Sequence, residues 1–297
     1  MNRHWVNGVA DAAVPPDDRG LLYGDGVFRT GLVWEGRLHA QDQHLQVLRQ
    51  DAAALGLDID LSRLESEILQ ATAGVARGRL RLTLTRQQDD RGYRPQWPAS
   101  CRRIITVGGL PERLPHCWQD GVAVALLSEP APELTGPLAA HKHLNRLPQV
   151  WAQRWLRPDS GLQEILRTNR AGLLIGGSMS TLFVRQTETG WVTPASTEGA
   201  LQGVSLRTVS GLMQQKAIPL RYGSVTPESL IDSEEAFVAN ALVGIWPLRS
   251  LCLCRAVGET SPVIRQWGAP GEHTLALMHE FRHPLMQSML TSGQDTT

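Results

Sequence analysis

Lysine is almost absent from this chain. Lysine and arginine together number 29 of 297 residues, yet only Lys142 and Lys216 are lysines. An ammonium group can lose its proton and become a nucleophilic amine, whereas a guanidinium stays protonated. A lysine in a chain that otherwise uses arginine therefore indicates chemistry that arginine cannot perform, such as a Schiff base with a carbonyl group.

The two lysines lie in different sequence contexts. Lys216 follows a helical pattern from Ser205 to Gln215, where a cation is favourable beside the last carbonyls of a helix. Lys142 stands between His141 and His143, after a loop-like stretch, and nearby imidazolium charge or burial would lower its pKa. Lys142 is therefore the candidate reactive amine, and an ordinary surface lysine is the alternative interpretation.

Other features are also missing, and their absence excludes several classes of protein. The formal net charge is +0, which provides no basic surface for nucleic acid or for an anionic membrane. No apolar run approaches the roughly 18 residues of a membrane span, and the N-terminus lacks the apolar stretch of a signal peptide. We therefore expect a cytoplasmic protein. The four cysteines form no C-x-x-C pair, which favours reduced, structural thiols.

Few known catalytic motifs occur in the sequence. Walker A, G-x-G-x-x-G and G-x-S-x-G patterns do not occur in the sequence. The stretch His279-Glu280-Phe281-Arg282-His283 matches the H-E-x-x-H pattern of zinc peptidases. A catalytic zinc needs a third protein ligand, and Pro284 disrupts the helix at once. A solvent-exposed helix face is therefore the favoured interpretation.

Hydrophobic periodicity predicts both strands and helices, which alternate from Val122 onward. Leu80, Leu82 and Leu84 alternate with polar residues, as in a half-buried strand. The glycine-rich stretch from Asp18 to Phe28 predicts a tight loop. A connection near Gly109–Pro115 divides the chain into domains 1–114 and 115–297. Further strands are predicted near residues 3–7, 27–34, 102–107, 122–127, 164–166, 181–184, 219–225 and 236–240. Asp42 is predicted to cap a helix that Gly56 stops, and Ser62–Glu65 is predicted to be the capping box of a second helix. Further helices are predicted from near Gly203, Thr226 and Gly271.

Five motifs then occur in the order seen in one enzyme family. They are Asp18-Arg19-Gly20-x-x-Tyr23-Gly24-Asp25-Gly26-Val27-Phe28, the run from Lys142 to Leu147, Ser180–Phe183, Gly203–Ser205 and Glu235–Ala241. In this order the chain resembles the class IV aminotransferases, the fold-type IV pyridoxal-phosphate enzymes, over about residues 4 to 285. Within the class, the Lys142 context and the Arg91-Gly92-Tyr93 loop resemble the 4-amino-4-deoxychorismate lyase branch more than the transaminases.

The resemblance implies a set of properties for this chain. It implies an α/β (α+β) fold in two domains, like that of the D-amino-acid aminotransferases. It also implies a homodimer and a Schiff-base lysine at Lys142 in the larger C-terminal domain. The implied reaction removes pyruvate from an aminated cyclohexadiene and leaves 4-aminobenzoate for the folate pathway. The implied site residues are Lys142 and Thr30 for catalysis, Ser178, Gly203, Val204 and Ser205 for pyridoxal 5'-phosphate, and Tyr23, Arg91, Tyr93 and Asn240 for substrate.

Two positions depart from the family pattern. Val47 stands where an arginine usually binds the phosphate, and Gly176 stands where a glutamate usually contacts the pyridine nitrogen. Loss of a charge-assisted contact weakens binding by about 1.5 to 3 kcal/mol, roughly ten- to a hundredfold. An elimination driven by aromatisation should tolerate the loss better than a transamination. The alternatives are a relative with altered or cofactor-independent chemistry on a chorismate-like substrate, a class IV aminotransferase, and a non-catalytic ligand-binding homologue.

Overall fold

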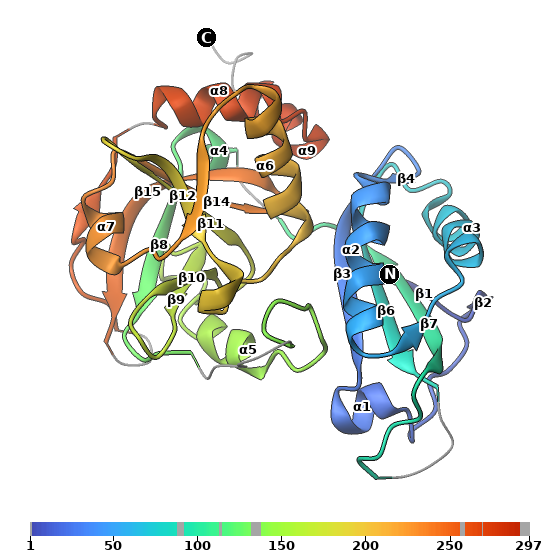
Figure 1. The fold of residues 1–297 in the computed structure, drawn as a ribbon. Coiled ribbons are helices and arrows are strands. Elements are labelled where there is room, and N and C mark those ends of the chain that lie inside the picture. Colours follow the sequence, from blue (N-terminus) through green and yellow to red (C-terminus); the bar gives the residue numbers. More distant parts are fainter. Residues whose placement is uncertain are drawn as a thin grey trace. The chain divides into compact units, whose positions relative to one another are not determined.

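The computed structural model describes residues 2–87, 92–112, 115–131, 138–255, 259–268 and 270–291. The chain forms two compact units, seen in Figure 1. The first comprises Met1–Glu112 together with His141–Asn145, and the second comprises Arg113–Ala140 and Arg146–Thr297. The division lies near the predicted boundary between residues 114 and 115. Lys142 was expected in the second domain, but its segment groups with the first unit because its backbone pairs with a strand there.

A mixed sheet forms the centre of the first unit. Its order is β2 (Val9–Ala10), β1 (Arg3–Val6), β7 (Ala99–Gly108), β6 (Arg77–Arg86), β3 (Gly26–Trp34) and β4 (Arg37–Leu38). A short strand, β5 (Leu57–Asp58), pairs in parallel with β7, and the other pairs are antiparallel. The predicted alternation on β6 is confirmed, since Leu80, Leu82 and Leu84 are all buried in the core.

Two helices pack their apolar sides against the same core. They are α2 (Gln41–Ala54) and α3 (Leu61–Thr72), which contribute Leu45, Leu48, Leu64 and Ile68 to it. The predicted caps of both helices were wrong. Ala40 precedes α2, with Asp42 in the first turn, and Asp60 rather than Ser62 caps α3. Asp60 is better placed because its carboxylate accepts from the Arg63 N–H at 3.0 Å.

The segment predicted as a tight loop contains a short helix, α1 (Arg19–Tyr23). The carboxylate of Asp18 caps it by accepting from the N–H groups of Gly20 and Leu21. The same carboxylate accepts from the Thr85 hydroxyl at 2.7 Å and pairs with Arg102. Gly24 ends the helix with φ 67°, a conformation that glycine adopts without strain. Contacts distant in sequence therefore fix a helical turn that local composition did not reveal.

A larger sheet forms the second unit. Its order is β10 (Leu174–Gly177), β9 (Glu164–Thr168), β8 (Val122–Leu127), β15 (Gly244–Cys254), β14 (Glu235–Asn240), β11 (Thr181–Gln186), β12 (Gly190–Pro194) and β13 (Leu220–Gly223). A short strand, β16 (Arg265–Gln266), pairs with β15. The long strand β15 pairs with β14 antiparallel and then with β8 in parallel, so it joins the two parts of the sheet.

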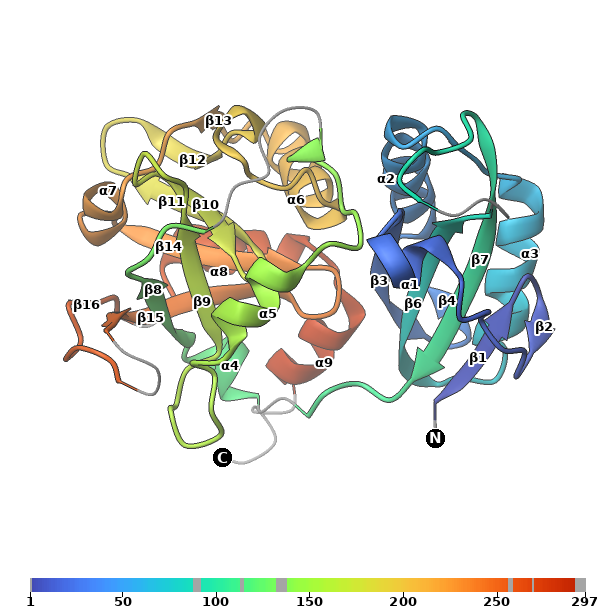
Figure 2. The ribbon, with the colours of Figure 1, turned by 90° about the horizontal axis from the view of Figure 1, so that it is seen from below.

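Helices surround this second sheet, as Figures 1 and 2 show. They are α4 (His116–Gln119), α5 (Leu147–Gln153), α6 (Val204–Gln215), α7 (Pro227–Ile231), α8 (Glu272–Glu280) and α9 (Pro284–Thr291), with a 3-10 turn at Ser196–Glu198. Lys216 ends α6, as predicted, and its amine lies 2.9 Å from Glu280. No helix in the described ranges has the length and apolar character needed to cross a membrane.

The H-E-x-x-H stretch does not form a single helix. Helix α8 ends at Glu280, and His283 lies just before α9. His279 is exposed, whereas His283 is buried with its Nε2 3.2 Å from the Ala241 carbonyl. The two imidazoles therefore do not share a helical face. Among the residues whose structure is described, no group of three His, Cys, Asp or Glu side chains is arranged to hold a metal.

Candidate active site

The backbone around Lys142 extends the first sheet. The Phe28 N–H donates to the Lys142 carbonyl at 3.0 Å, and the Leu144 N–H donates to the Gly26 carbonyl at 2.9 Å. Val27 and His143 form an antiparallel bridge between the same segments. The run from Lys142 to Leu144 therefore lies along the first residues of β3. This pairing fixes the position from which the lysine side chain extends.

The amine of Lys142 lies against an aromatic ring of the sheet. Its Nζ is 4.8 Å from the ring centroid of Phe28. Thr30, two residues further along β3, is on the same face as Phe28 because side chains alternate along a strand. The structure therefore brings together the two predicted catalytic residues, Lys142 and Thr30, on one face of the first sheet.

Arg81 is a further charged residue on this face, and no sequence motif indicated it. It is the direct partner of Thr30 on the neighbouring strand β6. Its guanidinium lies 4.0 Å from the ring centroid of Phe28. Burial, and secondarily the charge of Arg79, lowers the pKa of Arg81 from its ordinary value. No carboxylate in the described part of the chain forms an ion pair with it, so Arg81 is suited to bind an anionic group.

Two histidines of the first unit have lowered pKa values. Burial, reinforced by the charges of Arg29 and Lys142, lowers the pKa of His44 to about 3. Neither of its ring nitrogens has a hydrogen-bond partner among the described residues. Burial also lowers the pKa of His39. His44 therefore carries no charge at neutral pH.

The predicted substrate residues Tyr23 and Tyr93 lie together beside α1. Their ring centroids are 5.4 Å apart. The Gly92 N–H donates to the Tyr23 hydroxyl at 3.2 Å, and Arg19 donates to the Gly92 carbonyl at 2.7 Å. These contacts hold Gly92 against α1, and the Tyr93 side chain is largely exposed. Arg91 lies outside the described residues.

Val47 is a core residue of the first unit, with 1% of its surface exposed. It is on the buried side of α2, which also presents His44, Leu48 and Asp51. A valine provides no cation for a phosphate group. The structure therefore shows no replacement for the expected arginine at this position of α2.

In the second unit, the turn from Gly176 to Ser180 is organised by a buried carboxylate. Glu164, at the start of β9, is 0% exposed. It accepts from the N–H groups of Ser178 at 3.0 Å and Met179 at 3.2 Å. It also accepts from the hydroxyls of Ser178 and, at 2.6 Å, Ser180. Glu164 is therefore committed to this turn and does not supply the acidic contact that Gly176 lacks.

The same turn restricts two of the predicted cofactor positions. The hydroxyl of Ser178 donates to Glu164 and accepts from the Gln153 side chain at 2.5 Å. Its proton is thus used within the unit. Gly176 has φ +111°, and a Cβ atom there would lie 3.0 Å from the Ser180 carbonyl oxygen. A glutamate cannot replace Gly176 without strain in this backbone conformation.

The predicted phosphate residues Gly203, Val204 and Ser205 begin helix α6. Gly203 is the N-cap, and no side chain caps the helix. The helix has 12 residues, and its first N–H groups carry partial positive charge. Gly203 leaves open space beside the backbone, since a Cβ there would meet only Leu201 at 4.0 Å. The N-terminus of α6 is therefore suited to an anion such as a phosphate.

Asn240, a predicted substrate residue, ends β14. Its Oδ1 accepts from the N–H groups of Leu242 at 2.9 Å and Val243 at 3.1 Å. The side-chain oxygen therefore shapes the turn into β15. Only the amide nitrogen of Asn240 is left for a role in substrate binding.

Each unit, taken by itself, carries groups that suit part of pyridoxal phosphate. In the first unit, Lys142 provides a primary amine of the kind that an aldehyde group needs. In the second unit, the N-terminus of α6 provides N–H donors suited to a phosphate, whereas Gly176 provides no acidic partner for a pyridine nitrogen.

Comparisons with known proteins identify the family of the chain. The family model described as "Amino-transferase class IV" matches residues 26–251. The crystal structure of 4-amino-4-deoxychorismate lyase from Pseudomonas aeruginosa is similar to this one, and the two sequences are 30% identical. The match covers 95% of this chain and 99% of that one, with a TM-score of 0.82.

Curated relatives include both lyases and transaminases. An aminodeoxychorismate lyase from Bacillus subtilis is 28% identical over 260 residues, covering 83% of this chain and 86% of that protein. A D-alanine aminotransferase from Bacillus licheniformis is 26% identical over 246 residues, covering 82% and 84%. Pyridoxal phosphate is the cofactor of these enzymes. The predicted fold is confirmed, and the chain belongs to the class IV aminotransferase family.

Proposed function

We propose that this protein is a 4-amino-4-deoxychorismate lyase that uses pyridoxal phosphate and Lys142. The observation that carries the proposal is the fixed position of the lysine, whose Nζ lies over Phe28 on the face of β3 that also holds Thr30. The only other lysine, Lys216, ends a helix and pairs with Glu280. Lys142 is thus the one lysine placed beside other candidate catalytic groups. The similarity to lyases of known structure and sequence supports the same assignment.

Each residue on this face has a proposed role. When bound, pyridoxal phosphate supplies a ring that withdraws electrons from the carbon bearing the substrate amine. Lys142, in its neutral form, removes the proton from that carbon. The Thr30 hydroxyl donates a hydrogen bond to the ether oxygen of the leaving enolpyruvyl group. Arg81 binds a substrate carboxylate, because it is a cation without a carboxylate partner in the described structure.

The residues in the second unit favour a lyase over a transaminase. Gly176 provides no charge to keep the cofactor ring protonated, so the ring is a weaker electron sink. Transamination needs that sink in both of its half-reactions. Elimination of pyruvate is also driven by aromatisation of the product ring. The loss at Gly176 therefore costs an elimination less than it costs a transamination.

The test is an assay for two products with the two lysines as a matched pair. Purified protein with added pyridoxal phosphate should convert aminodeoxychorismate into 4-aminobenzoate and pyruvate in equal amounts. Lys142→Ala should lower the rate by about 10³-fold or more. Lys216→Ala should keep the wild-type rate, since Lys216 lies on the surface. Formation of D-glutamate from D-alanine and 2-oxoglutarate, without 4-aminobenzoate, would instead identify an aminotransferase.

We also propose that the active protein is a homodimer. Helix α5 exposes three apolar side chains on neighbouring positions of one face, namely Leu147, Val150 and Trp151. Exposed apolar faces of this kind are often covered by a partner chain. Light scattering of the purified protein would measure the mass, and Val150→Glu should shift it toward the monomer.

A further inference from the structure

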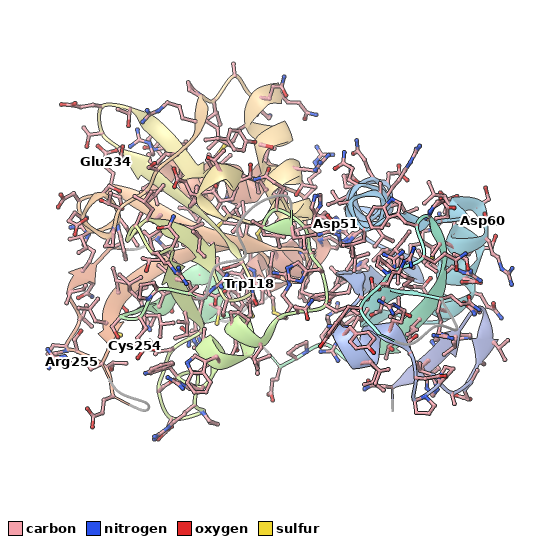
Figure 3. All side chains as sticks on the ribbon, turned by 60° about the horizontal axis from the view of Figure 1, so that its bottom comes forward. Asp51, Asp60, Trp118, Glu234, Cys254 and Arg255 are labelled. Atoms are coloured by element: carbon pink, nitrogen blue, oxygen red, sulfur yellow. The ribbon has the colours of Figure 1, made fainter. Side chains whose placement is uncertain are left out.

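We infer that Asp51 is a positioning residue that holds the Lys142 segment against the first sheet. It is near the end of α2, in the first unit, and is labelled in Figure 3. Its carboxylate is 2% exposed. Oδ1 accepts from His141 Nδ1 at 2.8 Å, and Oδ2 accepts from the Lys142 backbone N–H at 3.1 Å. Oδ2 also pairs with the Arg29 guanidinium.

These contacts complete the restraint of the lysine backbone. The carbonyl of Lys142 is held by the Phe28 N–H on β3. Its N–H is held by Asp51 on α2. The two peptide groups that flank the Lys142 Cα are each held by a hydrogen bond, so the direction in which the lysine side chain leaves the backbone is set by α2 and β3 together.

Arg29 explains why a buried carboxylate is tolerated here. A carboxylate removed from water is costly unless it is paired and hydrogen-bonded. The guanidinium of Arg29 is nearly as buried as Asp51 and extends from β3 toward α2. Arg29 is flanked on β3 by Phe28 and Thr30, which point to the opposite face. The charge pair thus links the strand that carries the proposed catalytic face to the helix that holds the lysine.

The inference connects to the departure at Val47. Val47 and Asp51 are four residues apart on α2, so they lie on one side of the helix. The resemblance places a phosphate-binding arginine at the position of Val47. In this chain the same side of α2 instead holds the lysine segment through Asp51. The positioning role rests on the proposal that Lys142 is the reacting amine.

Amine labelling tests the inference without cofactor or substrate. The full-length chain, cleared of cofactor with hydroxylamine, is treated with a trace of acetic anhydride. Peptide mass spectrometry then gives the acetylation of Lys142 relative to Lys216, which serves as an internal reference. Asp51→Ala should release the segment and raise this ratio about threefold or more, a change equal to half a pKa unit or greater. Asp51→Asn, which keeps the size and an acceptor oxygen, should return the ratio toward the wild-type value.

A matched control separates positioning from general stability. Glu67 is a second buried carboxylate of the first unit, bound by Arg103 through two contacts of 2.9 Å. Glu67→Ala should lower the melting temperature but leave the labelling ratio unchanged. If Asp51→Ala does not fold, His141→Ala removes one contact only and should raise the ratio in the same direction. The inference would be overturned if the folded Asp51→Ala or His141→Ala variant had the labelling ratio of the wild type while its melting temperature fell as much as that of Glu67→Ala.

A kinetic measurement adds a second readout. In the lyase assay, a displaced amine should lower kcat by about 10- to 100-fold and leave KM nearly unchanged. An unchanged kcat in the folded Asp51→Ala variant would overturn the role. If the wild type forms no 4-aminobenzoate, the proposed function fails, while the labelling ratios still decide whether Asp51 positions the lysine.

Discussion

Replacement of Glu164 by glutamine should destabilise the second unit. The glutamate is fully buried at the start of β9, and its two oxygens accept from backbone and hydroxyl groups of the Ser178–Ser180 turn. It also accepts from the Ile165 N–H at 2.8 Å. Its negative charge raises the pKa of Arg167, although the burial of that guanidinium lowers the pKa more strongly. One side chain therefore supports the turn and partly balances a buried cation.

The magnitude follows from these contacts. Glutamine has one acceptor oxygen, so an NH₂ group would face the donors of the other oxygen. The Ser180 hydroxyl can rotate and accept, but the Met179 N–H would lose its acceptor, which costs about 1 to 3 kcal/mol. The remaining contacts lose their charge assistance, and relief of the buried charge offsets part of this loss. We expect a net decrease of about 2 to 4 kcal/mol in the free energy of unfolding.

Urea unfolding measured by circular dichroism checks this value. Glu234→Gln is the control, because Glu234 is an exposed carboxylate of the same unit, labelled in Figure 3, and pairs with Arg185 at the surface. The control should change the free energy of unfolding by less than about 0.5 kcal/mol. Equal stability of Glu164→Gln and the wild type would refute the view that this carboxylate organises the turn.

Three further predictions concern stability. The pKa of His44 in the folded protein is about 3, below the ordinary value of 6.5. The contribution of neutral His44 to the free energy of unfolding is therefore fully present above about pH 6.5, and it decreases as the pH falls toward the folded pKa. Urea unfolding at about pH 7.5 and about pH 5 should show a loss of about 2 kcal/mol that His44→Leu removes; equal losses in both proteins would contradict it. Gly31→Ala should lower the free energy of unfolding by about 1 to 3 kcal/mol, since its Cβ would lie 2.5 Å from Leu38 and 2.8 Å from His44. Gly211→Ala is the control: this glycine lies in open space on α6, so the variant should raise the free energy of unfolding by about 0.5 to 1 kcal/mol. Gly176→Glu and Gly176→Ala should both lose about 1 to 3 kcal/mol in thermal unfolding, because the φ of +111° is the common cause; a stable glutamate variant would show that the backbone relaxes.

Local patterns in the sequence were sufficient for much of the fold. The alternation of Leu80, Leu82 and Leu84 predicted β6, and the Thr226–Pro227 signal predicted the start of α7. Pro284 was expected to disturb the last helix, and it begins a new one, because proline is favourable in a first turn. The cap of α3 was misplaced because Asp60 and Ser62 both have capping side chains, whereas Ala40, which precedes α2, makes no side-chain cap at all.

The site was only partly predictable for a different reason. Lys142 and Thr30 were identified from composition and motif order, and the structure places them on one face of the first sheet. Arg81 was missed because its relevance depends on its pairing with Thr30 across two strands. Glu164 was missed because the turn that it supports begins more than ten residues later in the chain.

The amino-acid sequence alone determined which amine is chemically available and which family the motifs resemble, because both depend on residue identity and order. Tertiary structure alone decided what surrounds that amine. Asp51 meets the Lys142 backbone across a separation of 91 residues. A contact of that range is set by the packing of α2 on β3, which no local pattern encodes.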